Sequence, residues 1–279
     1  MIAMSNIKMS QEIAGRQLLK DKVALIFAAT GGVGSTIARA FAREGAQVFL
    51  SSRRLPEVRN IAKEISSSGG IAEAAEVDAL DEESVEKYAQ EIFEKTGRID
   101  ISFNAIGTPQ EDEQGILLTD LSVENFIHPI LTYAKSHFIT SRAAARRMVR
   151  KGSGVILVHT PQPAVLGVPR LGGMSPAWAA IEALSRSLSA ELATQGIRAI
   201  RLRTTGLPET KTIEVVFGIH AKALGLTRSE FQRLQESAAH TKRSTTLAEL
   251  ANAAMFAASD LSKGMTGAVV NFTGGTIVD

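Results

Sequence analysis

The 279-residue chain contains no cysteine, which excludes a disulfide framework, a zinc–thiolate site and a thiol nucleophile. Aromatic residues make up only 5%, and the chain has one tryptophan and two tyrosines, so few phenols are available for acid–base chemistry. The net charge is +2 with both signs interspersed, which gives no indication of nucleic-acid binding. The five histidines are scattered without paired carboxylates, so no metal site is predicted.

Long apolar runs are also missing near the start of the sequence. The first 21 residues contain none long enough for a secretory signal or a membrane span, and we expect a cytoplasmic protein with no membrane partner. We expect residues 1–20 to be a partly helical N-terminal extension and residues 21–279 to form one domain. No Gly-x-Ser-x-Gly motif is present, so a hydrolase of the α/β type is not supported.

Short apolar runs alternate with longer stretches of helical periodicity. Strands are predicted over 22–29, 46–52, 70–78, 99–107, 154–160, 197–203 and 267–273, and helices over 35–45, 56–70, 81–97, 138–154 and 176–196. This alternation predicts an α/β fold: a single doubly wound, Rossmann-type parallel sheet with helices on both faces. The segment 207–247 interrupts the alternation just beyond a strand end, where open sheets bind ligands, and is predicted to be a substrate lid.

A glycine-rich turn, Ala28-Ala29-Thr30-Gly31-Gly32-Val33-Gly34, follows the first predicted strand. Glycine at such a turn lets the backbone approach a pyrophosphate, which then rests on the N-terminus of the following helix. The alternative is an ordinary glycine-rich surface loop. The position between a strand and a helix in the first βαβ unit favours nucleotide binding.

From about residue 20 to the C-terminus, the chain resembles the short-chain dehydrogenase/reductase family. The family's Thr-Gly-x-x-x-Gly-x-Gly turn corresponds to residues 27–34, with the last two glycines kept, Phe27 in place of the threonine and Ala28 in place of the first glycine. Its Asn-Asn-Ala-Gly motif corresponds to Asn104-Ala105-Ile106-Gly107, and its late Gly-Gly to residues 274–275. Residues 203–210 resemble its Pro-Gly-x-x-x-Thr stretch, although Thr210 could equally cap a helix.

The resemblance implies a set of cofactor-binding positions. They include the acidic residue near the adenine and the threonine that contacts the nicotinamide carboxamide in the family. In this chain the positions are Ala28, Thr30, Gly32, Val33, Gly34, Ser52, Arg53, Asp78, Asn104, Ala105, Gly107, Trp178, Gly206 and Thr210.

The end of the second predicted strand, Ser51-Ser52-Arg53-Arg54, bears on the choice of nicotinamide cofactor. A free ribose 2′-hydroxyl is recognised by a carboxylate, and none is present, whereas a 2′-phosphate is recognised by arginine. Arg53 can pair bidentately with a phosphate and Ser52 can donate a hydrogen bond. We therefore expect NADP(H) to be preferred over NAD(H), the alternative being two solvated arginines at the start of a helix.

The catalytic groups that the resemblance implies are an asparagine, a serine, a tyrosine and a lysine. Alignment of the helix AAIEALSRSL places Met174 at the tyrosine and Trp178 at the lysine, and family spacing places Pro161 at the serine and Tyr133 at the asparagine. Methionine has no proton to give and tryptophan has no ammonium, so the family's usual mechanism is not available from these positions. The alternative is that Met174 and Trp178 simply fill an old cleft with apolar volume.

Three residues are candidates for relocated catalysis: Tyr133, which has His137 one helical turn away, His159, and Thr160 beside Pro161. Tyr133 could instead pack within its helix, and strand alternation could point His159 away from the site. The leading hypothesis is a divergent NADP(H)-dependent oxidoreductase that acts on a small carbonyl or conjugated substrate through a non-standard proton donor. The second is a catalytically inactive nucleotide-binding subunit or sensor, and a third is loss of cofactor binding as well.

Family resemblance also implies self-association as a homodimer or homotetramer. The surfaces expected to associate are two long helices, over 133–150 and 176–194. The alternative is that these helix faces are buried against the chain's own sheet.

Overall fold

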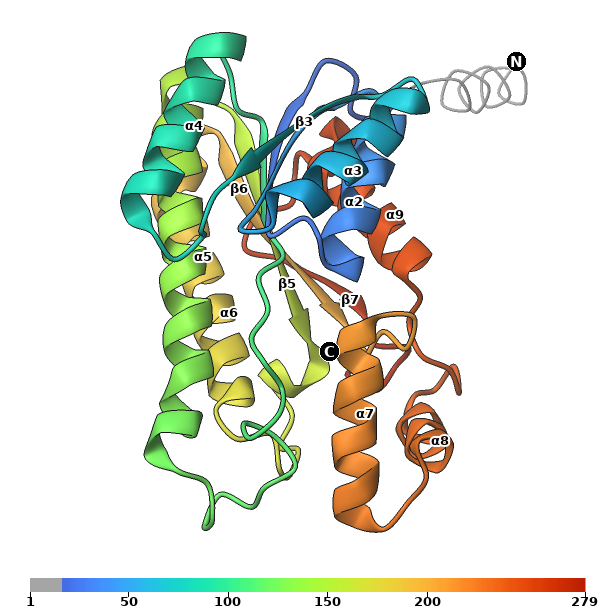
Figure 1. Ribbon diagram of the computed structural model, residues 1–279. Coiled ribbons are helices and arrows are strands. Elements are labelled where there is room, and N and C mark those ends of the chain that lie inside the picture. The colour runs from blue at the N-terminus through green and yellow to red at the C-terminus, as the bar shows by residue number, and fades with distance from the viewer. Residues whose placement is uncertain (1–16, 279) are drawn as a thin grey trace, which may run out of the picture.

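The computed structural model describes residues 17–278, which fold around one parallel sheet. Its seven strands lie in the order β3-β2-β1-β4-β5-β6-β7, all paired in parallel (Figure 1). They are β1 Val23–Phe27, β2 Gln47–Ser52, β3 Ile71–Glu76, β4 Ile101–Asn104, β5 Gly154–Pro161, β6 Ile197–Thr204 and β7 Val269–Phe272. The predicted doubly wound, Rossmann-type fold is confirmed.

The strand β1 shows why the sheet lies between two helical layers. All five of its residues are buried, and successive side chains enter different cores because a strand alternates its faces. Ala24 and Ile26 join the core formed with the helices α2 (Gly32–Arg43), α3 (Leu55–Ser67) and α9 (Leu247–Ala258). Leu25 and Phe27 join the core formed with α4 (Glu82–Thr96) and α5 (Val123–Lys151), beside which α6 (Met174–Leu192) packs.

The helix α5 begins well before its predicted start near residue 138. Ser122 caps it by accepting a hydrogen bond from the backbone N–H of Asn125, and Gly152 ends it in the left-handed region at φ 69°. Pro129 lies in the second turn, so the helix continues through a residue that usually marks a boundary. This early start places His128 and Tyr133 on the same helix.

The predicted lid segment contains two helices, α7 (Lys211–Leu224) and α8 (Arg228–Ala238), which lie beyond the ends of β5 and β6 (Figure 1). They share a small core of their own, in which the rings of Phe217 and Phe231 meet edge to face with centroids 5.3 Å apart. His220 of α7 also hydrogen-bonds Gln114 at 3.1 Å, which connects these helices to the loop after β4.

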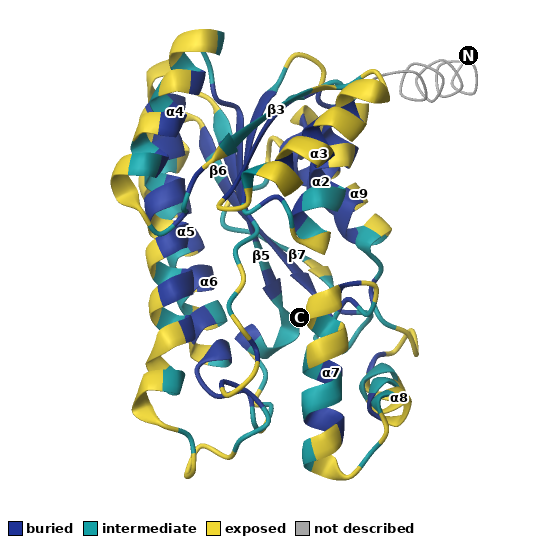
Figure 2. Ribbon diagram, viewed as in Figure 1, coloured by how far each residue is buried: buried dark blue, intermediate teal, exposed yellow. Residues whose placement is uncertain are grey.

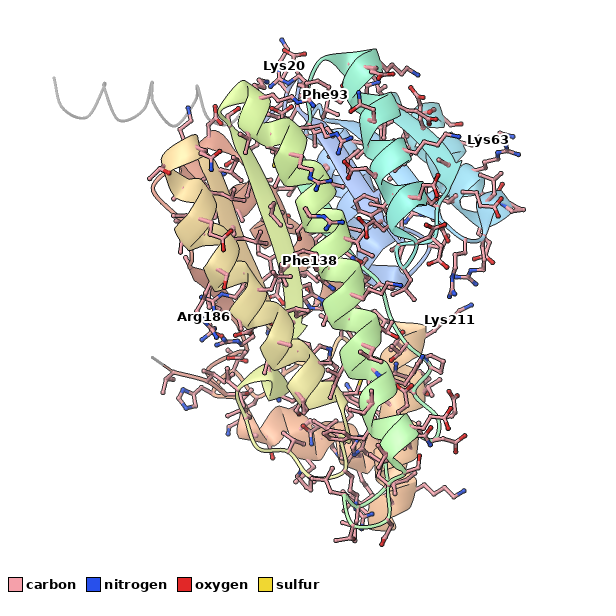
Figure 3. All side chains as sticks on the ribbon, turned by 90° about the vertical axis from the view of Figure 1, so that its left-hand side faces the viewer. Lys20, Lys63, Phe93, Phe138, Arg186 and Lys211 are labelled. Carbon is pink, nitrogen blue, oxygen red and sulfur yellow. The ribbon has the colours of Figure 1, made fainter. Side chains whose placement is uncertain are left out.

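Burial varies strongly between the elements (Figure 2). The five inner strands are largely buried and the edge strands β3 and β7 are partly exposed, whereas the outer face of α5 exposes apolar side chains, among them Leu131 and Phe138. Figure 3 shows Phe138 on this face. At the other end of the chain, Leu19 of the predicted extension is fully buried in the core; residues 1–16 of that extension lie outside the described residues. Within residues 17–278, no helix is long and apolar enough to cross a membrane.

Candidate functional site

The candidate site is a pocket at the carboxyl ends of the central strands. Parallel sheets bind ligands at this edge, where neighbouring connections leave in opposite directions. The pocket is lined by the glycine turn after β1, the segment after β4, one turn of α5, the end of β5, the start of α6 and the loop after β6. The residues are Gly31, Gly32, Val33, Gly34, Asn104, Ala105, Ile106, Gly107, Tyr133, His137, His159, Pro161, Trp178, Thr205, Gly206, Leu207, Thr210, Thr212 and Ile213.

The glycine turn leaves room at the start of α2. Gly31 precedes the helix without a side-chain cap, and a Cβ on it would meet no atom within 4 Å. Gly34 is constrained, since a Cβ there would lie 3.0 Å from the Ala105 side chain. The uncapped helix N-terminus and the open space before it are the features that a pyrophosphate needs.

Ala28, which replaces the family's first glycine, adopts φ 54° in the left-handed region. Side chains with a Cβ are strained there, so Ala28→Gly should raise the free energy of unfolding by about 0.5–1 kcal/mol, net of the extra entropy of the unfolded chain. Urea denaturation would measure the change. The matched control is Ala193→Gly, at φ −61°, where glycine should destabilise the fold. Destabilisation by both substitutions would show that Ala28 is not strained.

The segment after β2 brings Arg54, the neighbour of the predicted Arg53, over the glycine turn, and Arg54 also pairs with Glu57 at 3.0 Å. The Arg54 guanidinium donates to the Thr30 hydroxyl at 3.0 Å, and Ser52 Oγ lies 3.3 Å from the same hydroxyl. Arg53 is exposed and makes no side-chain hydrogen bond within residues 17–278. The sequence did contain a signal for Arg54, because it lies next to Arg53 and neighbouring residues of an extended segment point in opposite directions.

Tyr133 and Trp178 meet inside the pocket. Their rings are 6.4 Å apart between centroids and cross at 69°, an edge-to-face contact. Burial raises the pKa of the Tyr133 phenol, while hydrogen-bonding contributions from Trp178 and from Thr108 act to lower it. These two residues occupy the positions that the alignment gives to the family's asparagine and lysine. The phenol ring of Tyr133 and the indole ring of Trp178 are therefore in contact within the pocket.

Met174 does not line the pocket. It is fully buried in a small core with Val158, Leu171 and Tyr133, and its sulfur lies 3.8 Å from the Thr108 hydroxyl. Trp178 packs against the same core and is partly exposed at the pocket wall. Pro161 also lines the pocket and offers no donor there.

Two histidines face the pocket, and both are neutral at physiological pH. Burial lowers the pKa of His137 and of His159 to about 4. His137 Nδ1 donates to the Tyr133 carbonyl at 3.0 Å, which leaves its buried Nε2 as an unpartnered acceptor among the described residues. His159 Nε2 bonds Thr204 Oγ1 at 3.0 Å. Because Thr204 uses its own proton to bond the Thr205 carbonyl, His159 Nε2 must be the donor.

Thr160, the third catalytic candidate, lies outside the pocket. It is fully buried, and its hydroxyl donates to Glu182 Oε1 of α6 at 2.8 Å. Strand alternation accounts for this, because His159 and Pro161 face the pocket and the residue between them must face the other side.

The remaining predicted cofactor residues fall into two groups. Gly206 and Thr210 line the pocket, but the Thr210 hydroxyl also accepts from the Ile213 N–H at 3.2 Å and caps α7. Asn104 lines it as well. Its amide oxygen accepts a hydrogen bond from the backbone N–H of Ile106, and its amide nitrogen donates to the hydroxyl of Thr140. Asp78 lies outside the pocket wall and accepts from the Leu80 N–H at 2.9 Å.

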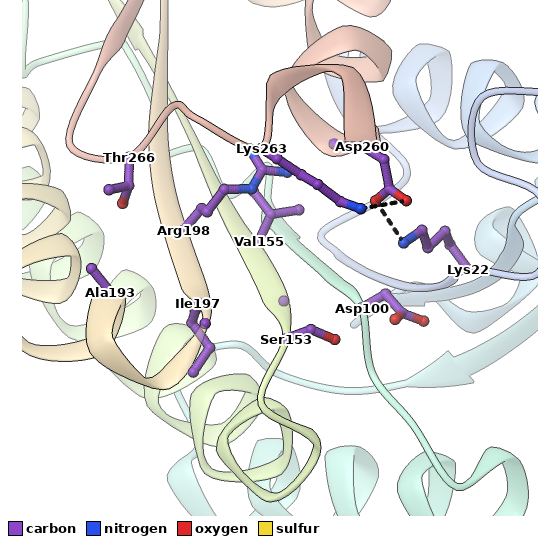
Figure 4. A pocket seen from close by; sticks show the side chains of 13 residues that line it. Lys22, Asp100, Ser153, Val155, Ala193, Ile197, Arg198, Asp260, Lys263 and Thr266 are labelled. Atoms are coloured by element: carbon purple, nitrogen blue, oxygen red, sulfur yellow. Dashed lines mark hydrogen bonds and ion pairs between the residues drawn. The ribbon is translucent and has the colours of Figure 1, made fainter.

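A second cavity lies at the amino edge of the sheet (Figure 4). Its charges are already partnered: Asp260 pairs with Lys22 at 3.1 Å and with Lys263 at 3.3 Å, and Arg198 donates to backbone carbonyls that include that of Ala257. Parallel sheets place their chemistry at the opposite edge. In the part of the chain that the structure describes, no cluster of three or more histidines and carboxylates could hold a metal.

Comparisons with known proteins agree with this fold. A family model described as enoyl-(acyl carrier protein) reductase matches residues 27–276. An uncharacterized oxidoreductase of Bacillus subtilis is 28% identical, covering 92% of this chain and 91% of its own. L-Rhamnose 1-dehydrogenase (NAD(P)(+)) of Azotobacter vinelandii is 28% identical, covering 94% and 99%. The crystal structure of sorbitol-6-phosphate 2-dehydrogenase from Erwinia amylovora superposes with a TM-score of 0.86 at 25% identity, covering 92% and 100%.

Proposed function

The chain belongs to the short-chain dehydrogenase/reductase family, and from this premise we propose that it is a divergent NADP(H)-dependent reductase of a small, uncharged carbonyl or conjugated substrate. The proposal includes a relocated proton donor, Tyr133, oriented by Trp178. The observation that carries it is the contact of these two side chains in the pocket that also contains the glycine turn.

The described residues fit a nicotinamide dinucleotide. The open start of α2 at Gly31 suits the pyrophosphate, and Gly107 likewise has no atom within 4 Å of an added Cβ. Trp178 and Thr210 would border the nicotinamide half. When bound, NADPH supplies a hydride to the substrate.

A preference for NADP(H) is supported by Arg54, with no carboxylate at the end of β2. Arg54→Ala should weaken NADPH binding by about 1–3 kcal/mol and leave NADH binding unchanged, because only NADPH carries the 2′-phosphate. Calorimetry with both cofactors would measure this, with the exposed Arg59→Ala as the control on the same helix. Selective loss in Arg53→Ala instead would return the role to Arg53, and equal affinity of the parent for both cofactors would contradict the preference.

The reaction needs a proton on the substrate once the hydride has been accepted, and we assign this proton to the Tyr133 hydroxyl. Its raised pKa keeps the phenol protonated, and the Trp178 indole can donate to the phenolate that forms. No charged side chain lines the pocket within residues 17–278, which supports an uncharged substrate. The free acceptor at His137 Nε2 would suit a hydroxyl or amide donor on it.

A catalytically inactive nucleotide-binding protein is the second candidate. It is favoured by Met174, which fills the position of the family's acid with buried apolar volume. Both candidates predict cofactor binding, and only the first predicts turnover.

The single tryptophan separates the candidates. Titration with NADPH should quench Trp178 emission, because its indole borders the nicotinamide side of the pocket. The same protein is then assayed for NADPH oxidation with a panel of uncharged ketones, aldehydes and enones. Quenching with turnover supports the reductase, and quenching without turnover supports the inactive protein. Tight binding without quenching would mean that Trp178 does not face the cofactor.

We also propose a homodimer or homotetramer that associates through α5 and α6. Leu131 is 62% exposed and Phe138 47% exposed on the outer face of α5, more apolar surface than a solvated helix needs. Besides its own subunits, we propose that the protein binds a small-molecule substrate and neither nucleic acid nor a membrane.

A further inference from the structure

His137 leaves a hydrogen-bond acceptor unused at the pocket. Its side chain is 2% exposed, and its Nδ1 donates to the Tyr133 carbonyl at 3.0 Å within α5. Because a carbonyl can only accept, the ring proton is on Nδ1 and the neutral ring carries a lone pair at Nε2. Nε2 is buried and has no hydrogen-bond partner within residues 17–278. The proton transfer described above does not use this atom.

A buried acceptor without a partner is uncommon in a folded protein, because folding removes its water without supplying another hydrogen bond. The ring of His137 is already held by its bond to the backbone and by stacking on the Tyr133 ring, with centroids 6.1 Å apart. Phenylalanine would serve this stacking and would leave no polar atom unpaired. The imidazole therefore indicates a ligand that uses Nε2 when it binds.

The second pocket histidine presents an acceptor as well. His159 donates from Nε2 to the Thr204 hydroxyl at 3.0 Å, so its ring proton is on Nε2 and the lone pair is on Nδ1. Nδ1 makes no hydrogen bond in the described part of the chain. Both rings line the pocket, whose described lining carries no charged side chain. Two lone pairs in an uncharged pocket suit an uncharged donor such as a hydroxyl.

We propose that His137 Nε2 accepts a hydrogen bond from a hydroxyl group of the bound ligand. The hydroxyl belongs either to a sugar of the nicotinamide dinucleotide or to the substrate, where it is a group other than the reacting carbonyl. The inference rests on the proposed function, in which both molecules enter this pocket. His137 is then a specificity-determining residue, because it selects a ligand that carries this hydroxyl and takes no part in the proton transfer.

Nitrogen NMR of protein with isotope-labelled histidine rings observes this acceptor directly. An unprotonated ring nitrogen gives a signal apart from that of a protonated one, and its signal moves when it accepts a hydrogen bond. Three samples are compared: NADPH alone, NADPH with propane-1,2-diol, and NADPH with butan-2-ol. The two alcohols differ by a hydroxyl in place of a methyl group. Neither can accept a hydride, so no turnover disturbs the measurement.

The signal of His137 Nε2 is assigned by its loss in His137→Phe. It should move with NADPH alone if a sugar hydroxyl is the donor, and His137→Phe should then weaken NADPH binding by about tenfold. If the donor is on the substrate, the signal should move with the diol and not with butan-2-ol, and His137→Phe should weaken binding of the diol by about tenfold. A signal that stays in place in all three samples, or moves equally with both alcohols but not with NADPH, would overturn the inference.

Matched variants separate binding from folding. His240→Phe replaces an exposed histidine and should change the affinity for neither NADPH nor the diol. His137→Gln keeps a side-chain acceptor and should restore most of the affinity lost in His137→Phe. If His137→Phe does not fold, His137→Gln assigns the signal and the parent's NMR alone decides the outcome. Turnover with an unmoved Nε2 signal would refute this inference alone, whereas a moved signal without NADPH oxidation by any carbonyl of the panel would refute the reductase alone.

Discussion

Tyr133→Phe is expected to lower kcat for NADPH oxidation by about 10²–10⁴-fold, the usual contribution of a positioned general acid. Phenylalanine keeps the ring that packs against Met174 and Trp178, so the pocket should retain its shape. NADPH binding, followed by quenching of Trp178 emission, should therefore stay close to that of the parent. The loss should appear in kcat and in kcat/KM alike, because the proton is transferred only in the transition state.

Tyr88→Phe is the matched control for this substitution. Tyr88 is also buried in a helix, where its ring meets Phe27 edge to face at 6.1 Å between centroids, and it does not line the pocket. Losing its unpartnered hydroxyl should leave kcat unchanged. If Tyr133→Phe kept the parent's kcat, the proton would have to come from His159 or from water.

The fold could be predicted because its signals are local and repeated. Buried strands such as β1 appear as short apolar runs, and the helices between them have amphipathic periods. The start of α5 could not be predicted in this way, because Pro129 suggests a boundary that the cap at Ser122 and the surrounding packing override. The glycine turn was predictable because its chemistry lies in one contiguous stretch.

Side-chain direction in the site was harder to predict. Whether Arg53 or Arg54 turns toward Thr30 does not follow from the sequence, because a change in the backbone dihedral angles of this irregular segment would exchange the directions of the two side chains. Thr160 and His159 are neighbours with opposite directions, and the register of β5 decides which faces the pocket. The contacts of Glu113 with Thr108 and His128 depend on how a long loop folds back, for which no short-range pattern exists.

A buried charge cluster between α6 and β6 should give the largest effect on stability. Glu182 is 1% exposed, and Arg203 binds it bidentately, with Nε at 3.0 Å and Nη2 at 2.7 Å. Arg201 lies 3.6 Å from the same carboxylate, and Thr160 donates to it. One carboxylate therefore faces two buried guanidinium groups.

Glu182→Gln is expected to lower the free energy of unfolding at pH 7 by about 3–5 kcal/mol, because it leaves both buried guanidinium groups without a counter-charge. Glutamine has nearly the shape of glutamate, so the loss reflects charge rather than volume. Urea denaturation at one protein concentration would measure it. Glu191→Gln, an exposed position on the same helix, should change stability by less than about 0.5 kcal/mol.

The effect of pH gives the prediction a second, independent check. Burial by itself would raise the pKa of Glu182, but hydrogen bonds from Arg203 and Thr160 outweigh it and hold the pKa below 4.5. The stabilising charge is therefore fully present above pH 4.5, and it is lost as the pH falls through the lowered pKa of the folded state. The difference in stability between the parent and Glu182→Gln should be constant near neutrality and shrink in acid. A difference that persisted unchanged at pH 3, or grew there, would mean that the Glu182 charge does not stabilise the folded protein.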